Sequence, residues 1–251
     1  MTNDHDTSER DGTAASTVSG AHRSGPGNPA RARRRRILAI AAAASLANGI
    51  ALLGTILFAL PLPLLLVAAW TIGIIALAAI VAASAPAARA GLTAFIVVGL
   101  GAGIVATLAY DVSKAILSQL DPSPFNPFET VKVFGRLLLG ESASPEAMLI
   151  AGWIFHLVNG WTFAVAYTLL VARAGGVSRW RGILTGIAFG LFLELFQLTL
   201  YPGWLNVRFL DEFRQISFLG HVVFGAVLGI LVPAGLRWAG HRARSATGGR
   251  P

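Results

Sequence analysis

Three side chains that can exchange protons or bind metals lie inside long apolar segments of the sequence. They are His156, Glu194 and His221, each about 8 to 10 Å from the nearer end of its segment at the helical rise of about 1.5 Å per residue. An ionised group at this depth costs several kcal/mol unless it is paired, so such residues are candidates for function. Further polar residues accompany them, namely Asn159 and Gln197 near the same level and Asp111 at the end of its segment.

Several kinds of chemistry fit this polar layer. Glu194 and the histidines could form structural hydrogen bonds between helices. His156, His221 and Glu194, with Asp111 as a further ligand, could bind Zn, Fe or Mn, although no H-x-x-x-H or H-E-x-x-H spacing supports a metal site. Haem held between the two histidines is a variant of this hypothesis. Proton relay or transport is another, but the inner halves of the segments contain no comparable polar residues.

Enzymatic chemistry on a lipid or isoprenoid substrate at the outer leaflet fits the same residues. A histidine would act as the general base and Glu194 would orient it. The sequence contains no nucleophile motif and no phosphate-binding loop, so enzymatic activity stays open. The absence of cysteine excludes disulfides, thiolate metal sites and cysteine nucleophiles.

Small residues at every fourth position lead up to each carboxylate. The two patterns are Gly99-x3-Gly103-x3-Thr107-x3-Asp111 and Gly182-x3-Gly186-x3-Gly190-x3-Glu194. Residues four apart share one face of a helix, so each pattern forms a stripe that lets another helix approach closely. Each is followed by an apolar segment with a histidine above a similar stripe, His156-x3-Gly160-x3-Ala164 and His221-x3-Gly225-x3-Gly229. We therefore predict a doubled hairpin of acid helix and histidine helix over residues 91–236.

The composition indicates a membrane protein. Apolar residues make up 55% of the chain and charged residues 13%, with a mean hydropathy of +0.66, which is not typical of a soluble domain. Six apolar segments approach the roughly 20 residues that cross a bilayer, without the alternation of barrel strands. The sequence thus predicts an all-α integral membrane protein with spans at 37–60, 62–83, 91–110, 149–172, 182–201 and 216–236.

Lys and Arg residues are distributed unevenly about these spans. If the N-terminus is cytoplasmic, fifteen of the 20 lie inside, and only Lys114, Lys132, Arg136, Arg208 and Arg214 lie outside. This asymmetry obeys the positive-inside rule. We predict a multi-pass protein of the bacterial plasma (inner) membrane with both termini in the cytoplasm.

The segments outside the spans are polar. Residues 1–36 and 237–251 are predicted to be disordered cytoplasmic tails. The basic run Arg33, Arg34, Arg35 and Arg36 is expected to meet anionic lipid headgroups, and nucleic acid is not expected because no aromatic residues interleave with it. In the outer loop, 111–148, the apolar spacing of residues 128–139 predicts a short interfacial helix, either a lid over the bundle or a plain linker.

Short motifs resemble those of a known group of proteins. The run Gly99 to Thr107, the histidine helix from His156 to Tyr167, the Tyr201-Pro202 step and Gly220-His221 follow one another as in the YagU-like group of small bacterial inner-membrane proteins. The resemblance covers residues 91–236. It implies an association with acid resistance. The group has no established catalytic activity, and the resemblance assigns no ligands.

Overall fold

The computed structural model describes residues 29–122, 125–195, 204–205 and 209–246. These residues form helices and no strands, which confirms the predicted all-helical class. The helices are α1 (Pro29–Ser45), α2 (Ala47–Phe58), α3 (Leu62–Ala82), α4 (Pro86–Leu120), α5 (Glu129–Leu139), α6 (Pro145–Ala174), α7 (Arg179–Glu194) and α8 (Leu210–Ala246).

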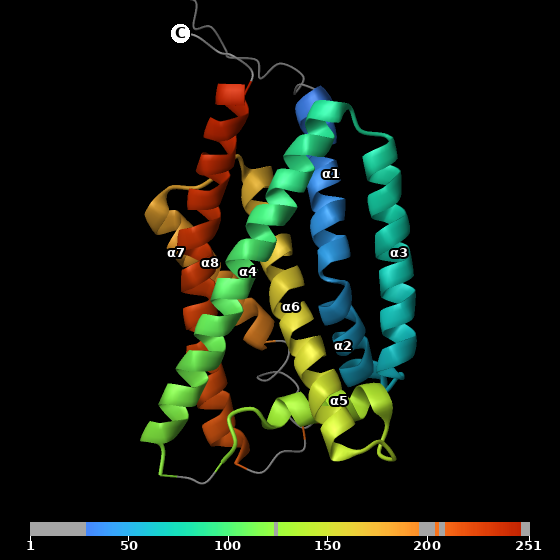
Figure 1. Ribbon diagram of the computed structural model, residues 1–251, viewed down its shortest axis with the longest axis vertical. Coiled ribbons are helices and arrows are strands. Elements are labelled where there is room, and N and C mark those ends of the chain that lie inside the picture. Colours follow the sequence, from blue (N-terminus) through green and yellow to red (C-terminus); the bar gives the residue numbers. More distant parts are fainter. Residues whose placement is uncertain (1–28, 123–124, 196–203, 206–208, 247–251) are drawn as a thin grey trace, which may run out of the picture.

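The long helices run up and down around α6. In Figure 1, α4 crosses in front of α6, with α8 and α7 on one side and the α1–α2 pair on the other. Helix α3 stands at the edge of the bundle and α5 lies across one end. Large side chains around α3, including Val67, Ile72 and Ile75, are exposed, as expected for a helix that faces lipid.

Four of the described helices are long and apolar enough to cross a membrane: α3, α4, α6 and α8. Helices α1 and α2 meet at a 54° bend and make a fifth candidate if they count as one span. The six predicted spans and the repeated hairpin are therefore not confirmed. The difference lies in α7, because its 16 residues are fewer than the roughly 20 that a crossing needs. The remainder of the predicted span 182–201, from residue 196, lies outside the described residues.

Several boundaries differ from the prediction. Helix α4 does not end at residue 110 but continues through Asp111 to Leu120. The basic run Arg33–Arg36, predicted to be disordered, belongs to α1, and α8 continues past residue 237 to Ala246. A helix satisfies its own backbone in water as well as in lipid, so it need not end where the apolar run ends. The short helix predicted at 128–139 is confirmed as α5.

Helix α6, which carries His156, has well-defined ends. Ser144 caps its start by accepting a hydrogen bond from the Ala147 amide (3.2 Å), and Pro145 occupies the first turn, where its missing N–H is no loss. Gly175 ends the helix with a left-handed φ of 88°, a conformation that costs glycine little. These ends fix which residues of α6 lie at the level of the site.

The glycine stripes lie at helix contacts. A Cβ at Gly99 or Gly103 of α4 would touch the backbone of α6 at Val165 or Trp161 (2.7 and 3.0 Å). A Cβ at Gly186 would collide with the Gly225 carbonyl of α8. The same holds for Gly182 against Gly229 and for Gly190 against His221. Because nothing larger than hydrogen fits there, the backbones of α7 and α8 are in direct contact.

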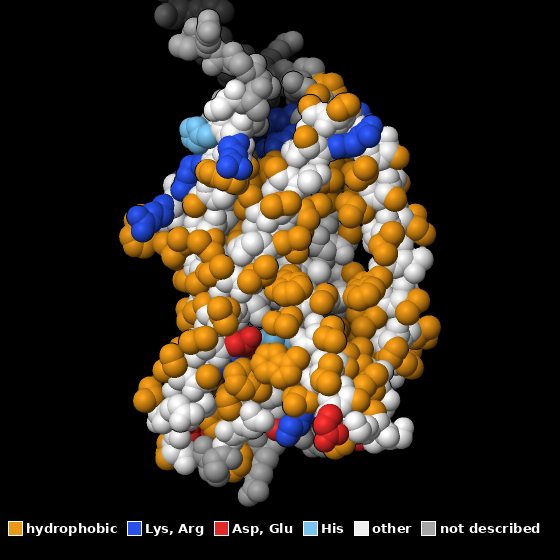
Figure 2. Space-filling view, in the orientation of Figure 1, with side chains coloured by type: hydrophobic (Ala, Val, Ile, Leu, Met, Phe, Trp, Pro, Cys, Tyr) orange, Lys and Arg blue, Asp and Glu red, His pale blue; other side chains and the backbone are white. Residues whose placement is uncertain are grey.

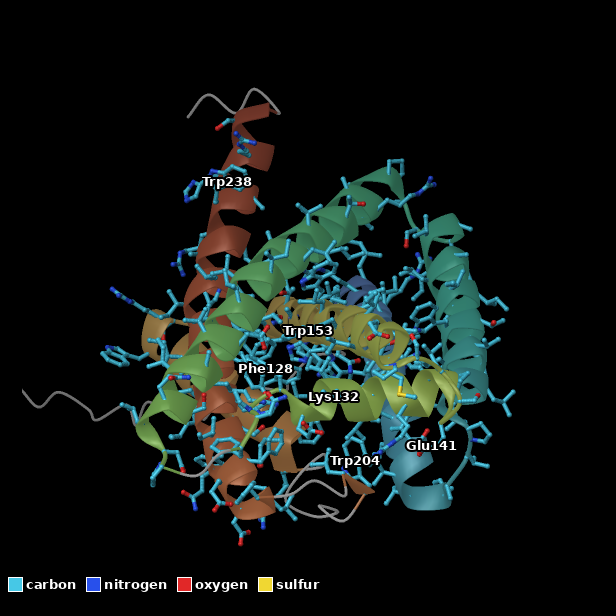
Figure 3. All side chains as sticks on the ribbon, turned by 60° about the horizontal axis from the view of Figure 1, so that its bottom comes forward. Phe128, Lys132, Glu141, Trp153, Trp204 and Trp238 are labelled. Carbon is cyan, nitrogen blue, oxygen red and sulfur yellow. The ribbon has the colours of Figure 1, made fainter. Side chains whose placement is uncertain are left out.

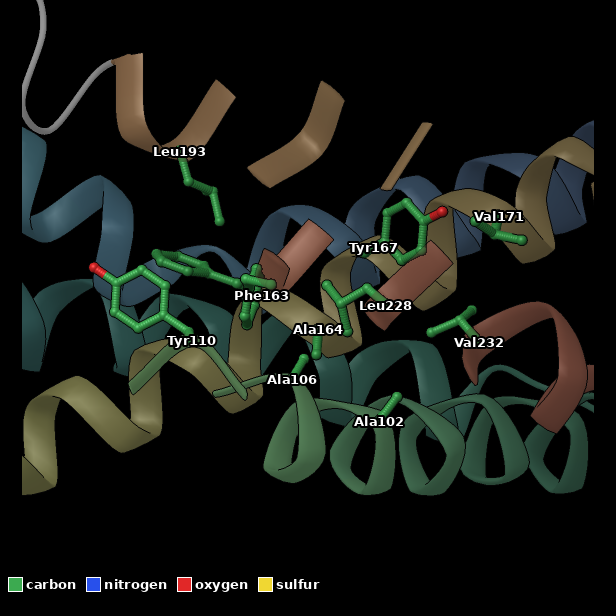
Figure 4. Packing of buried hydrophobic residues seen from close by; sticks show 11 residues of the cluster. Ala102, Ala106, Tyr110, Phe163, Ala164, Tyr167, Val171, Leu193, Leu228 and Val232 are labelled. Atoms are coloured by element: carbon green, nitrogen blue, oxygen red, sulfur yellow. The ribbon is translucent and has the colours of Figure 1, made fainter. Parts of the chain in front are cut away.

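The largest cluster of buried apolar side chains joins α4, α6, α7 and α8. Small residues, Ala102 and Ala106 of α4 and Ala164 of α6, lie where the helices cross. In Figure 4 the rings of Tyr110 and Phe163 lie close together on the Leu193 side of this cluster. The core thus ends in aromatic side chains at the level where the polar residues begin.

The two ends of the bundle differ in charge. Lys and Arg side chains gather at the end that contains the start of α1 and the C-terminal part of α8, the arginine-rich end (Figure 2). Asp and Glu do not occur in residues 29–110, 147–193 or 213–246, so the described carboxylates belong to the other part of the bundle. We call the end crossed by α5 the acidic end.

Candidate functional site

A cavity of about 60 Å³ lies between the helices near the acidic end. Helices α4, α5, α6, α7 and α8 all contribute to its wall. Its aromatic lining consists of Tyr110, Phe134, Phe163, Trp204, Phe213 and Phe224, and its polar lining of Thr107, Thr130, His156, Asn159, Ser217 and His221. We call it the aromatic cavity. The predicted site residues His156, Asn159 and His221 therefore all line this cavity, together with Gly160.

His156 forms an ion-pair type contact with Asp111. The imidazole Nε2 lies 2.9 Å from the Asp111 Oδ1. An ionised carboxylate can only accept, so Nε2–H donates and the neutral ring keeps its lone pair on Nδ1. Asp111 was expected at the end of its span, but α4 continues to Leu120, so Asp111 lies about 14 Å before the end of the helix and in contact with His156.

His221 is held by its own helix. Its Nδ1–H donates to the Ser217 carbonyl oxygen (2.9 Å), which fixes the tautomer because a carbonyl only accepts. The lone pair of the neutral ring is then on Nε2. The Tyr110 ring contacts both histidines, with centroid distances of 5.8 Å to His156 and 4.9 Å to His221.

A buried lysine adjoins this cluster. Lys114 is only 2% exposed, and its Nζ lies over the rings of Phe213, Tyr110 and Phe128 at 4.5, 5.1 and 5.7 Å from their centroids. Its ammonium donates to the Tyr110 hydroxyl (3.4 Å), which lies 3.3 Å from the Ser217 hydroxyl. Aromatic faces attract a cation and so offset part of its loss of hydration. The apolar pattern that predicted a span ending at Tyr110 gave no reason to expect this residue in the interior.

Two polar groups in the cavity wall lack partners within the described part of the chain. The Asn159 carboxamide oxygen and the Thr107 hydroxyl have no hydrogen bond, although these residues are only 6% and 2% exposed. Buried polar groups are nearly always hydrogen-bonded because leaving one unpaired costs about 1–3 kcal/mol. Both residues line the aromatic cavity, so a bound molecule or water can satisfy them.

Helix α5 closes the acidic end of the cavity. Phe134 of α5 packs against Phe155 of α6 and stacks on Trp204, with ring centroids 5.1 and 6.0 Å apart. Gly135 and Gly152 leave no room for a Cβ, because one would collide with the Met148 or the Val131 carbonyl. Figure 3 shows α5 crossing this end, with Trp153 above it and Trp204 below.

The Asp111–His156 pair lies near the side of the bundle. The two side chains are 15% and 18% exposed, while Leu108 and Val112 on the same helix are exposed apolar residues. Figure 2 shows red and pale blue atoms together on this otherwise largely apolar side. His156 also lines the aromatic cavity, so it connects the cavity with the lateral surface.

Glu194 does not share the cavity. It is buried at the end of α7 and lines a different pocket with Asp211, Arg214 and Phe218. Its predicted neighbour Gln197 lies outside the described residues. Among the described residues no three His, Asp or Glu side chains are grouped so that they could hold a metal ion. The predicted metal set of His156, His221 and Glu194 is therefore not found as a group among the described residues. Haem between His156 and His221 stays a hypothesis.

Comparison of the chain with protein-family models, with curated proteins and with solved structures finds no significant match. The resemblance to the YagU-like group stays a prediction. Functional inference consequently depends on the site itself.

Proposed function

We propose that the chain is a multi-pass membrane protein that binds the polar head of a small amphiphile from the outer leaflet in the aromatic cavity. The observation that carries this proposal is the pair of unpartnered, buried polar groups on Asn159 and Thr107 beside two histidines. The four or five long apolar helices support the membrane location. The concentration of arginine at the opposite end supports a cytoplasmic arginine-rich end, which puts the cavity in the outer half.

The size of the cavity limits what enters it. A volume of about 60 Å³ holds about four to six water molecules at the roughly 10–15 Å³ that each requires. A whole lipid does not fit, but a hydroxyl- or amine-bearing head does. The apolar remainder would leave between α4 and α6, past the Asp111–His156 pair, toward the exposed Leu108 and Val112.

The side chains that line the cavity limit which polar head group of an amphiphile can bind there. Asn159 both donates and accepts, and the Nε2 of neutral His221 accepts, so a group that donates hydrogen bonds satisfies both. Aromatic side chains surround these polar atoms and favour an apolar or cationic group next to the hydrogen-bonding one. A primary or secondary alcohol, or an amine, on a hydrocarbon chain meets these requirements.

A second candidate is an enzyme that acts on the same amphiphile. The observation that favours it is the 2.9 Å contact by which Asp111 orients His156 in the cavity wall. A carboxylate that holds one imidazole nitrogen leaves the other free to take a proton from a bound hydroxyl. The residue predicted to orient the histidine was Glu194, and Asp111 takes that place. Transport gains no supporting observation from the described residues.

Asn159→Leu tests the proposed function because its two expected effects have opposite signs. Removing an unpaired buried polar group is expected to stabilise the ligand-free protein by about 1 kcal/mol. The same change removes a ligand contact, so an amphiphile that co-purifies in stoichiometric amount with the wild type is expected to be lost. Thermal unfolding in detergent and mass spectrometry of the extracted lipids measure the two effects.

Asn48→Leu is the matched control. Asn48 is also a buried asparagine. Its carboxamide oxygen accepts from Trp70 Nε1 (2.5 Å) while its Nδ2 has no partner among the described residues, and it lines a separate hollow among α1, α2 and α3. This variant is expected to retain the amphiphile. If the wild type carries only bulk phospholipid, or if Asn159→Leu retains the same compound, the cavity is not a binding site.

A further inference from the structure

A second pocket lies at the arginine-rich end, away from the aromatic cavity. It has a volume of about 610 Å³ and lies among α1, α4, α8 and the turn between α6 and α7. Three arginines from three helices line it, Arg34 of α1, Arg181 of α7 and Arg237 of α8. We call it the arginine pocket. None of the described residues that line it is a carboxylate.

The three guanidinium groups are not paired within the described residues. Within the part of the chain that the structure describes, these groups make one contact, in which the Arg34 guanidinium lies 5.9 Å from the centre of the Phe95 ring. By contrast, Arg33 and Arg89 at the same end donate to backbone carbonyls, those of Ala83 and Ser84, each at 2.8 Å. The pocket therefore gathers three positive charges whose donors are available to a ligand.

The chemistry of the lining identifies the kind of ligand. Guanidinium groups present forked donors that match the oxygens of phosphate, and several of them together offset its charge. Ser178, also in the lining, does not cap α7 with its side chain, so its hydroxyl is free to add a further hydrogen bond. Apolar atoms of Phe95 and Leu236 complete the wall and suit the hydrocarbon next to a lipid phosphate.

We propose that the arginine pocket binds a phosphate group. The phosphate would come either from the headgroup of an anionic lipid or from a free phosphate ion, since the same guanidinium fork recognises both. This site is separate from the aromatic cavity, and its failure would leave the proposed function standing. It differs from the general attraction of a basic tail to a membrane, because it depends on where three particular arginines lie and not on their number.

The test compares two triple variants of the full chain in detergent. Arg34→Gln, Arg181→Gln and Arg237→Gln remove the three arginines of the pocket. The control, Arg31→Gln, Arg35→Gln and Arg173→Gln, removes the same charge from exposed positions outside its lining. Binding of dioctanoyl phosphatidylglycerol is measured by calorimetry, with dioctanoyl phosphatidylcholine as the zwitterionic comparison. The pocket triple is expected to weaken phosphatidylglycerol binding by about tenfold or more, and the control triple by less than about threefold.

Two further arms complete the experiment. The triple variant Arg34→Lys, Arg181→Lys and Arg237→Lys keeps the positive charge but lacks the forked guanidinium donors, so an intermediate loss of phosphatidylglycerol affinity is expected. Because it keeps the charge, this variant also provides a test if the glutamine triple misfolds. Inorganic phosphate that competes with the lipid would identify a free phosphate as a ligand, and failure to compete would identify the lipid headgroup. Equal losses in the two glutamine triples, or no preference of the wild type for phosphatidylglycerol, would overturn the proposal.

Discussion

Replacing Gly186 with valine is expected to abolish the folded bundle. A side chain at this position would collide with the Gly225 carbonyl and would meet the backbone nitrogen of Gly229 at 2.8 Å. Backbone atoms cannot rotate away as the end of a side chain can, so α7 and α8 would have to separate along their whole contact. Overpacking against side chains costs about 1–3 kcal/mol, and against backbone we expect more than about 3 kcal/mol.

The matched control is Gly101→Val in α4. Gly101 is helical and exposed, and a Cβ there would meet nothing within 4 Å. This substitution is expected to change the free energy of unfolding by no more than about 0.5 kcal/mol, because the helix propensities of valine and glycine differ by only a few tenths of a kcal/mol. The two variants are compared by the yield of monodisperse protein in detergent and by thermal unfolding. Similar behaviour of both would show that α7 and α8 do not pack through their glycines.

Removing the Asp111 carboxylate is expected to cost about 1–3 kcal/mol of stability. The contact with His156 is part-buried, and without the carboxylate the imidazole Nε2–H loses its acceptor. Asp111→Asn keeps an acceptor for the Nε2–H and is expected to cost clearly less than Asp111→Ala. Equilibrium unfolding in mixed micelles gives both values.

A double-mutant cycle isolates the contact itself. If Asp111 and His156 stabilise each other, the double alanine variant is expected to lose about 1.5 kcal/mol less than the sum of the two single variants. Packing losses common to both routes cancel in the cycle. Additive losses would mean that the 2.9 Å contact contributes nothing, and the second candidate function would lose its basis.

Three of the predicted site residues line one cavity. His156, Asn159 and His221 were at one level in the spans predicted from their apolar neighbours, and all three line the aromatic cavity. Depth along a helix is predictable because the rise per residue is constant. The direction around the helix is harder to predict. Glu194 follows Leu193, which lines the cavity, but successive side chains point about 100° apart, so Glu194 lines another pocket.

The continuation of α4 beyond Tyr110, with Asp111 and Lys114 packed within it, was not predicted, for a different reason. Charged residues after Tyr110 ended the apolar run, and the span was taken to end with it. Yet Ile116, Leu117 and Leu120 continue an apolar face over three more turns, which allows α4 to carry Asp111 to His156 and Lys114 into its aromatic surroundings. Whether a charged residue ends a helix or lies buried within it depends on partners from other helices, which the local pattern does not contain.

The close packing of α5 on α6 bears on how a ligand would arrive. A Cβ at Gly135 or Gly152 would collide with backbone of the facing helix, so α5 closes the acidic end wherever these two contacts are kept. An amphiphile would then diffuse in from the side, within the plane of the bilayer. Occupancy of the cavity would then depend on the mole fraction of the amphiphile among the lipids. The concentration of the amphiphile in water would matter only because it sets how much of the amphiphile partitions into the bilayer. An affinity measured in detergent would accordingly shift with the amount of detergent, because each added micelle dilutes the ligand in the only phase from which it binds.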